Sequence, residues 1–208
     1  MSGLKIFTLL LLGWLAASSA SALSLSELTR ILDSIEHFEA DFYQQVLDEQ
    51  DEVIQEAKGN ISLKKPGRFR WHYDAPISQH IVADGTNLWM LDLDLAQVTV
   101  QPINQALGSA PIMLLMENMS LEDDFEIRAM PVALGLDWIA LVPRIQDTEF
   151  YRIEMGLDGE HVREMKLYDH FDQKTVIRFS NIDTLKQLDD SDFKFYLPSG
   201  VDVVGEPE

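Results

Sequence analysis

Two alternating segments joined by a tight turn, residues 59–73, constrain the fold of this chain more than any other stretch. Apolar or small residues occupy every second position on both sides of the turn: Gly59, Ile61, Leu63, Phe69, Trp71 and Tyr73. A period of two is typical of half-buried strands. Lys65-Pro66-Gly67-Arg68 lies between the segments, with Pro and Gly at the second and third positions of a type II turn. The pattern predicts a β-hairpin with one apolar, aromatic face and one basic face.

A helix is predicted at the start of the mature chain. Ser24 and Glu27 fit a capping box, in which each side chain bonds the backbone amide of the other residue. Apolar residues then recur at steps of three and four: Leu25, Leu28, Ile31, Leu32, Ile35 and Phe38. This spacing gives the helix one apolar stripe, which must pack against another apolar surface.

Alternation with a period of two recurs along most of the remaining chain. It predicts strands at residues 38–46, 53–63, 78–83, 88–91, 97–103, 136–142, 149–156, 161–168 and 175–182, and another from Phe125. Residues 109–116 are typical of a buried helix, and 193–204 of a final extended segment broken at Pro198. The pattern predicts an α+β fold: a strongly curved antiparallel sheet, or incomplete barrel, of about 10–12 strands with an N-terminal helix and short helices.

Residues 1–22 have the features of a secretory signal peptide. Lys5 precedes an apolar run from Ile6 to Ala17, and the small residues at positions 20–22 fit a cleavage site. This run is shorter than the roughly 20 residues needed to span a bilayer, so the segment is not expected to be a membrane anchor. The mature chain, residues 23–208, is expected to fold as one domain.

Composition excludes several classes of function. The 208 residues include no cysteine, so disulfides and a lipid-modified N-terminal Cys are excluded. The formal net charge is −19, from 35 acidic and 16 basic residues. Such a charge argues against nucleic acid as a partner.

The sequence contains no convincing catalytic or metal site. It has no G-x-S-x-G elbow, no phosphate-binding loop and no G-x-G-x-x-G motif. The histidines lack the spacing that converges on zinc: His37, His72, His80, His161 and His170. No enzyme activity, metal or cofactor is therefore expected. Acidic pairs such as Asp92 and Asp94 leave a secreted hydrolase with an acidic dyad as the alternative, although such pairs arise freely in so acidic a chain.

Four stretches, in order, resemble the periplasmic outer-membrane lipoprotein carrier family, LolA. They are residues 38–44 (FEADFYQ), the hairpin 59–73, residues 79–89 (QHIVADGTNLW) and residues 193–203 (FKFYLPSGVDV). The resemblance covers nearly all of the mature chain. It implies a periplasmic chaperone, expected to be a monomer, that ferries lipoproteins from an inner-membrane ABC transporter to an outer-membrane receptor. A lipid-sensing regulatory domain of similar fold is a further alternative.

The resemblance also implies where lipoproteins bind. LolA-like proteins are incomplete barrels lidded by helices, and the acyl chains lie between sheet and lid. The lipid-binding cavity is accordingly expected to be lined by Phe38, Phe42, Ile61, Leu63, Phe69, Trp71, Trp89, Met113, Leu114 and Met116. The flexible methionines suit a surface that repacks around variable ligands. The alternative is that these residues fill an ordinary core, because periodicity does not distinguish a filled core from a cavity.

Two basic residues of the hairpin turn are candidates for closing the lid. Lys65 precedes the hairpin proline, where the family usually has an Arg that bonds backbone carbonyls of the lid helices and keeps the empty cavity shut. Lysine offers mobile donors instead of a planar fork, so Arg68 is a second candidate for this role. The alternative for Lys65 is a solvated residue beside a turn.

Overall fold

The computed structural model describes residues 24–103, 115, 121–145 and 148–208. Its strands are β1 His37–Leu47, β2 Val53–Lys64, β3 Arg68–Tyr73, β4 Gln79–Asp84, β5 Asn87–Asp92, β6 Gln97–Pro102, β7 Phe125–Ala129, β8 Asp137–Pro143, β9 Phe150–Leu157, β10 Val162–Asp169, β11 Lys174–Asp183 and β12 Asp202–Val204. The predicted strands before β12 agree with these bounds to within one residue.

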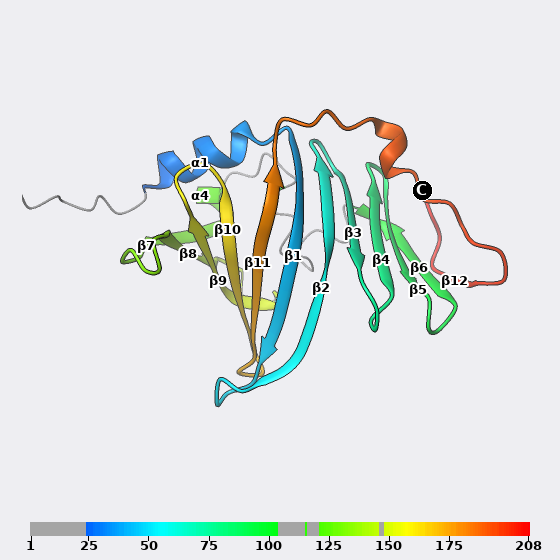
Figure 1. Ribbon diagram of the computed structural model, residues 1–208, viewed down its shortest axis with the longest axis horizontal. Coiled ribbons are helices and arrows are strands. Elements are labelled where there is room, and N and C mark those ends of the chain that lie inside the picture. The colour runs from blue at the N-terminus through cyan, green and yellow to red at the C-terminus, as the bar shows by residue number, and fades with distance from the viewer. Residues whose placement is uncertain (1–23, 104–114, 116–120, 146–147) are drawn as a thin grey trace, which may run out of the picture.

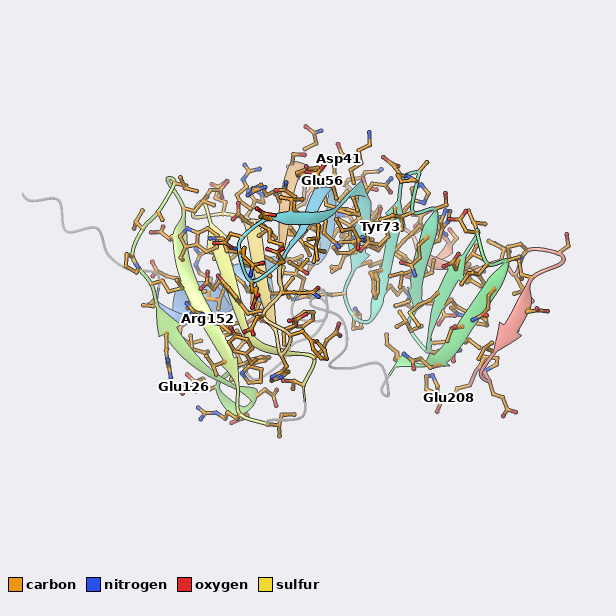
Figure 2. All side chains as sticks on the ribbon, turned by 90° about the horizontal axis from the view of Figure 1, so that it is seen from below. Asp41, Glu56, Tyr73, Glu126, Arg152 and Glu208 are labelled. Carbon is orange, nitrogen blue, oxygen red and sulfur yellow. The ribbon has the colours of Figure 1, made fainter. Side chains whose placement is uncertain are left out.

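The strands form one open, curved sheet of 12 strands in the order β12-β6-β5-β4-β3-β2-β1-β11-β10-β9-β8-β7 (Figure 1). Every neighbouring pair is antiparallel except β12 and β6, which are parallel. Seen from below, the sheet is an arch, with β7 and β12 at opposite edges (Figure 2). The predicted α+β class with an incomplete antiparallel barrel is confirmed.

Helix α1 (Leu25–Ser34) begins at the predicted capping box. The Ser24 hydroxyl accepts a hydrogen bond from the Glu27 amide, and the Glu27 carboxylate accepts one from the Ser24 amide. The helix ends earlier than its apolar stripe suggests, because Ile35 is already extended and Phe38 belongs to β1. Among the described residues, none of the helices is long and apolar enough to cross a membrane.

The hairpin that organises the sequence is formed by β2 and β3. Gly67 has a φ of +69°, as its place in the turn requires, and the Lys65–Pro66 peptide bond is cis. Gly59 allows a close approach at the other end of the hairpin, since a Cβ atom there would lie 1.8 Å from the carbonyl oxygen of His72. The sequence pattern and backbone sterics therefore fix the same pairing of these strands.

The C-terminal segment is less regular than predicted. Asp190–Phe193 form a 3-10 turn, η1, and strand pairing is limited to β12. Pro198 lacks the backbone N–H that strand pairing needs, and Gly200, with a φ of +82°, interrupts the extended conformation before β12. A second short helix, α4 (Leu121–Asp124), leads into β7.

Candidate functional site

One face of the sheet, which we call the inner face, is apolar from strand to strand. Register places Leu63 beside Phe38 and Phe69, and Ile61 beside Trp71. Six predicted cavity residues lie on this face, with exposed fractions of 0 to 6%: Phe38, Phe42, Ile61, Leu63, Phe69 and Trp71. The structure therefore brings these six residues together on one buried surface.

The inner face continues over β8 to β11, which the sequence interpretation left out of the site. Its buried residues there are Ile139, Leu141, Ile153, Met155, Leu157, Met165, Leu167, Ile177 and Phe179. They occupy every second position of their strands, so the alternation itself was the available signal. The ring of Phe38 meets that of Phe179 edge-on at 5.7 Å, which joins the two halves of the inner face across β1.

An aromatic cluster lies in the middle of the inner face. The ring of Phe42 is 4.5 Å from that of Trp71 and 5.2 Å from that of Tyr73. The Tyr73 hydroxyl donates a hydrogen bond to Gln44 Oε1 at 3.1 Å. Burial raises the pKa of Tyr73 to about 12, although the side chains of Trp71 and Gln44 oppose that rise. The cluster is therefore apolar in bulk and neutral at physiological pH.

Helix α1 packs against the same surface. Its buried stripe joins the core cluster of the inner face through Leu28, Ile31, Leu32 and Ile35. Leu115, from a segment predicted to be helical, is also fully buried in that cluster. The predicted cavity residues Met113, Leu114 and Met116 lie outside the described residues.

Lys65 links the β2–β3 turn to α1. Its Nζ donates to the backbone carbonyl oxygen of Leu32 at 2.7 Å, and its backbone N–H donates to the carbonyl of Glu36 at 2.9 Å. Carbonyls in the last turn of a helix lack partners within the helix, and a cation there also interacts favourably with the helix dipole. Burial lowers the pKa of Lys65, while the charge of Asp33 opposes this. Lys65 therefore joins the β2–β3 turn to the last turn of α1.

Arg68 does not share this contact. Strand alternation places it on the other face of the sheet, which we call the outer face. There its Nη2 lies 3.3 Å from Asp190 Oδ2, and its Nη1 donates to the carbonyl of Pro66 at 3.3 Å. The prediction that Arg68 helps Lys65 to hold the lid is therefore corrected: Arg68 holds η1 instead.

Trp89 also lies on the outer face. Its neighbours in β5, Leu88 and Met90, pack into the inner core, so Trp89 points the other way. Its ring stacks on Phe195 at 4.9 Å with an interplanar angle of 10°, and its Nε1 donates to Asp84 Oδ2 at 2.7 Å. The placement of Trp89 among the cavity residues is corrected accordingly.

Asp92 and Asp94, the acidic pair of the alternative hydrolase interpretation, lie at the turn between β5 and β6. Asp92 Oδ1 accepts hydrogen bonds from the backbone amides of Asp94 and Leu95, both at 3.0 Å, which caps the β5–β6 connection. No group of three or more metal-ligating side chains occurs among the residues that the structure describes. Asp92, one member of the predicted acidic pair, thus has a local structural role in this turn.

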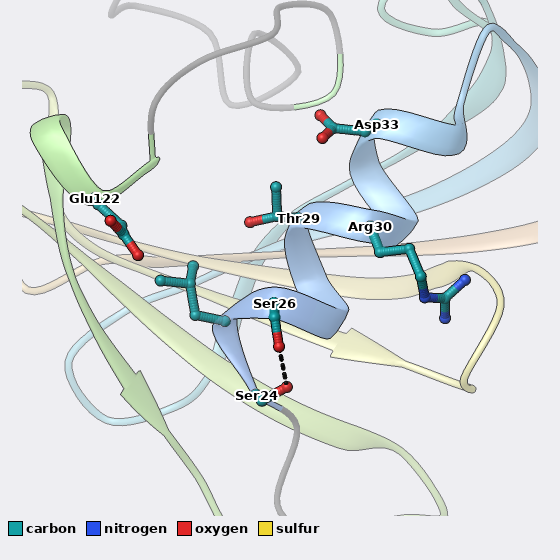
Figure 3. Close-up of a pocket in the computed structure, with 7 residues that line it drawn as sticks. Ser24, Ser26, Thr29, Arg30, Asp33 and Glu122 are labelled. Carbon is teal, nitrogen blue, oxygen red and sulfur yellow. Dashed lines mark hydrogen bonds between the residues drawn. The ribbon is translucent and has the colours of Figure 1, made fainter.

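A separate depression lies between α1 and α4, with a volume of about 670 Å³ (Figure 3). Most of its lining is polar: Ser24, Leu25, Ser26, Thr29, Arg30, Asp33 and Glu122. Glu122 belongs to α4, and none of the α1 residues in this lining is among the buried residues Leu28, Ile31 and Leu32. The depression therefore lies beside α1 and shares only Leu25 with the residues packed on the inner face.

Solved structures share this fold at low sequence identity. An uncharacterised conserved protein from Thermus thermophilus is 14% identical, with a TM-score of 0.53, over 85% of this chain and 98% of that one. A crystal structure of MucB is 15% identical, with a TM-score of 0.50, over 86% of this chain and 64% of that one. At these identities the likeness shows the fold alone.

Comparisons at the level of sequence identify the family of this chain, which the solved structures do not. A family model described as outer membrane lipoprotein carrier protein LolA matches residues 33–196. A protein of Methylococcus capsulatus named outer-membrane lipoprotein carrier protein is 42% identical, over 95% of each chain. A protein of Nitrosomonas europaea with the same name is 38% identical, over 96% of this chain and 97% of its own. The chain therefore belongs to the outer membrane lipoprotein carrier protein (LolA) family.

Proposed function

We propose that this protein is a periplasmic, monomeric carrier that shields the acyl chains of lipoproteins. In this proposal it accepts lipoproteins from an inner-membrane ABC transporter and delivers them to an outer-membrane receptor, without catalysis. Family membership supports the role, since relatives that match over nearly the whole chain are named as such carriers. The structural observation that carries the proposal is the continuous apolar inner face beneath α1.

The energetics of the cargo explain why the cover matters. At ~0.8 kcal/mol per buried CH₂, one long acyl chain contributes on the order of 10 kcal/mol when it is fully buried. A carrier that gained all of this would not release its cargo. Loading that first separates α1 from the inner face gives up contacts of Leu28, Ile31 and Leu32, which offsets part of the gain. The cargo is then held firmly enough to cross water and loosely enough to leave.

Two tyrosines on adjacent parts of the sheet allow a direct test. Tyr73 belongs to the inner aromatic cluster, whereas Tyr43 is on the outer face and bonds Glu56. A photo-reactive benzoylphenylalanine in place of either tyrosine preserves an aromatic ring at that position. The purified variants would be incubated with spheroplasts that display lipoproteins, irradiated, and the soluble fraction analysed for crosslinked lipoprotein.

We expect lipoproteins to enter the soluble fraction only when the protein is present, and to crosslink at position 73 but not at position 43. Absence of release would contradict the carrier role. Release accompanied by crosslinks only at position 43 would retain the carrier role and reject the inner face as the binding surface.

A further inference from the structure

Among the residues that the structure describes, the Trp71 indole N–H is a buried hydrogen-bond donor without an acceptor. Trp71 is 6% exposed, and its Nε1 has no hydrogen-bond partner among the described residues. The other two tryptophans that the structure describes do have acceptors, since Trp89 donates to Asp84 and Trp138 to the carbonyl of Ala133. Trp71 therefore differs from these two in the middle of the proposed binding surface.

The surroundings of Trp71 hold its ring in place. Ile61 and Ile81 flank it in the sheet, and the Phe42 ring lies 4.5 Å away at an angle of 45°. The ring of Tyr73 is 6.0 Å away on the same face. A donor fixed among apolar groups interacts strongly with any acceptor that reaches it, because little competing water is present. The position is thus preorganised to bind one acceptor.

An unsatisfied buried donor also has a cost in stability. A buried N–H without an acceptor lowers the folding equilibrium constant by roughly tenfold or more relative to a satisfied one. Phenylalanine would fill much of the same space without that cost. The presence of tryptophan instead of phenylalanine at the centre of the inner face is therefore explained if an acceptor arrives with a ligand.

Tyr73 does not supply this acceptor in the observed arrangement. Its hydroxyl donates to Gln44 Oε1, and no hydrogen bond joins it to Trp71. The indole still acts on this hydroxyl as a hydrogen-bonding group, because it lowers the pKa of Tyr73 against the larger effect of burial, and the two rings lie 6.0 Å apart on the inner face. Within the cluster of Phe42, Trp71 and Tyr73, the indole N–H and the hydroxyl are the two polar groups.

We propose that the Trp71 indole N–H binds an acyl carbonyl oxygen of the cargo, at the point where a fatty chain joins its ester or amide link. This inference rests on the proposed function, because it assumes that acyl chains enter the inner face. Saturated chains offer the surface only methylene groups, so the carbonyl is the one acceptor that every acyl chain carries with it. The bond fixes how deeply the chain enters and makes the site selective for acyl over alkyl lipids.

The test compares two lipids that differ only in the carbonyl. Dipalmitoylglycerol carries ester carbonyls, and dihexadecylglycerol carries the same chain length through ether links. The full-length mature protein would be equilibrated with an equimolar mixture in vesicles, and the bound ratio would be read by native mass spectrometry. We expect wild type to prefer the ester by about tenfold, as one hydrogen bond in apolar surroundings allows.

Two variants separate the effect of the Trp71 indole N–H from the effect of the packing of its ring. Trp71→Phe removes the N–H, and a benzothienylalanine at the same position keeps the bicyclic shape without the N–H, which guards against a loss of packing. Both should bind the two lipids about equally. Tyr73→Phe, which removes the neighbouring hydroxyl, should keep the ester preference.

The outcomes distinguish this inference from the proposed function. Binding of both lipids by wild type without preference, or an unchanged preference in both Trp71 variants, would overturn the role of Trp71 while leaving the carrier intact. Loss of the preference in Tyr73→Phe alone would assign the site to the hydroxyl and likewise overturn it. If wild type binds neither lipid, the apolar inner face is not a lipid site, and the proposed function fails with it.

Discussion

The two halves of the sheet have similar inner faces but different outer faces. On the outer face of β4 to β6, Val82, Leu91, Val98 and Val100 have exposed fractions of only 0 to 5%. On the outer face of β9 to β11, charged side chains take the corresponding positions. The sheet thus stabilises its second face in two ways, by a cover in one half and by ion pairs in the other.

The cover of the first half is the C-terminal segment. Phe193 in η1 is fully buried, and Phe195 stacks on Trp89. Asp190 binds Lys64 Nζ at 2.7 Å as well as Arg68, which ties η1 to the ends of β2 and β3. Further on, a Cβ atom at Gly205 would lie 2.0 Å from the carbonyl oxygen of Val100, so only glycine permits this close approach.

The second half relies on paired charges. Glu154 and Glu164 are 4% and 7% exposed, and each has a cationic partner: Arg152 for Glu154, and Arg178 for Glu164 at 2.9 Å. Lys166 lies 3.9 Å from the centre of the Trp138 ring, a distance typical of a cation–π contact. The two buried carboxylates are thus paired with cations on this face, where the covered half has apolar side chains instead.

The largest effect is expected for Phe193→Ala, which tests the covered half. Removing a fully buried phenylalanine should lower the free energy of unfolding by about 3–5 kcal/mol, through lost apolar burial and the cavity that remains. Denaturant unfolding followed by tryptophan fluorescence would measure this. Lipid bound per folded molecule should not change, because Phe193 lies on the face opposite to the inner core.

The matched control is Tyr196→Ala, in the same segment but 75% exposed, which should leave stability nearly unchanged. Equal losses in both variants would break the distinction between a packed cover and a surface strand. A fall in bound lipid per folded Phe193→Ala molecule would show that the cover of the outer face also controls the inner face.

The wrong prediction for Trp89 has the same origin, because the first half of the sheet is covered on both faces. In β5 the residues Leu88 to Leu91 are all apolar, because both faces of this strand are buried. Period-two alternation assigns faces only where one face is polar, as in β3 or β10. The sequence therefore predicted that β5 exists, and its bounds, but could not tell which side of it faces α1.

Two further features could not be predicted from local sequence patterns: the partner of Arg68 and the residue at which α1 ends. Arg68 was grouped with Lys65 because they flank the same turn, yet its partner Asp190 lies far along the sequence. The apolar stripe of α1 continues in register to Phe38, so periodicity alone could not reveal that the chain becomes extended at Ile35. The capping box, in contrast, depends only on residues three apart, and it was predicted correctly.

A smaller effect is expected for Glu164→Gln, which tests the charged half. The change keeps the shape but removes the charge that faces Arg178 and Lys166. Because the Arg178 side chain is 48% exposed, water screens much of the interaction, and we expect a loss of about 1–2 kcal/mol in unfolding free energy. Addition of salt should narrow the gap between the variant and wild type.

The exposed pair Glu126 and Arg128 provides the control for that measurement. Its side chains are 54% and 62% exposed, so Glu126→Gln should cause no measurable loss. A loss in Glu164→Gln as large as that in Phe193→Ala would contradict the view that the charged half gains less from each contact than the covered half.

The smallest effect on stability, with the clearest effect on transport, is expected for Lys65→Met. The variant loses the hydrogen bond from Nζ to the Leu32 carbonyl, which should cost about 1 kcal/mol, while its apolar stem keeps much of its packing. In the proposed carrier, a weaker tie between α1 and the β2–β3 turn favours the loaded state, so delivery to outer membranes should slow severalfold. Lys65→Arg retains a donor and should restore delivery. If Lys65→Met delivers lipoproteins at the wild-type rate, α1 is as permanent a cover as the C-terminal segment, and the contrast between a movable inner cover and a fixed outer one is lost.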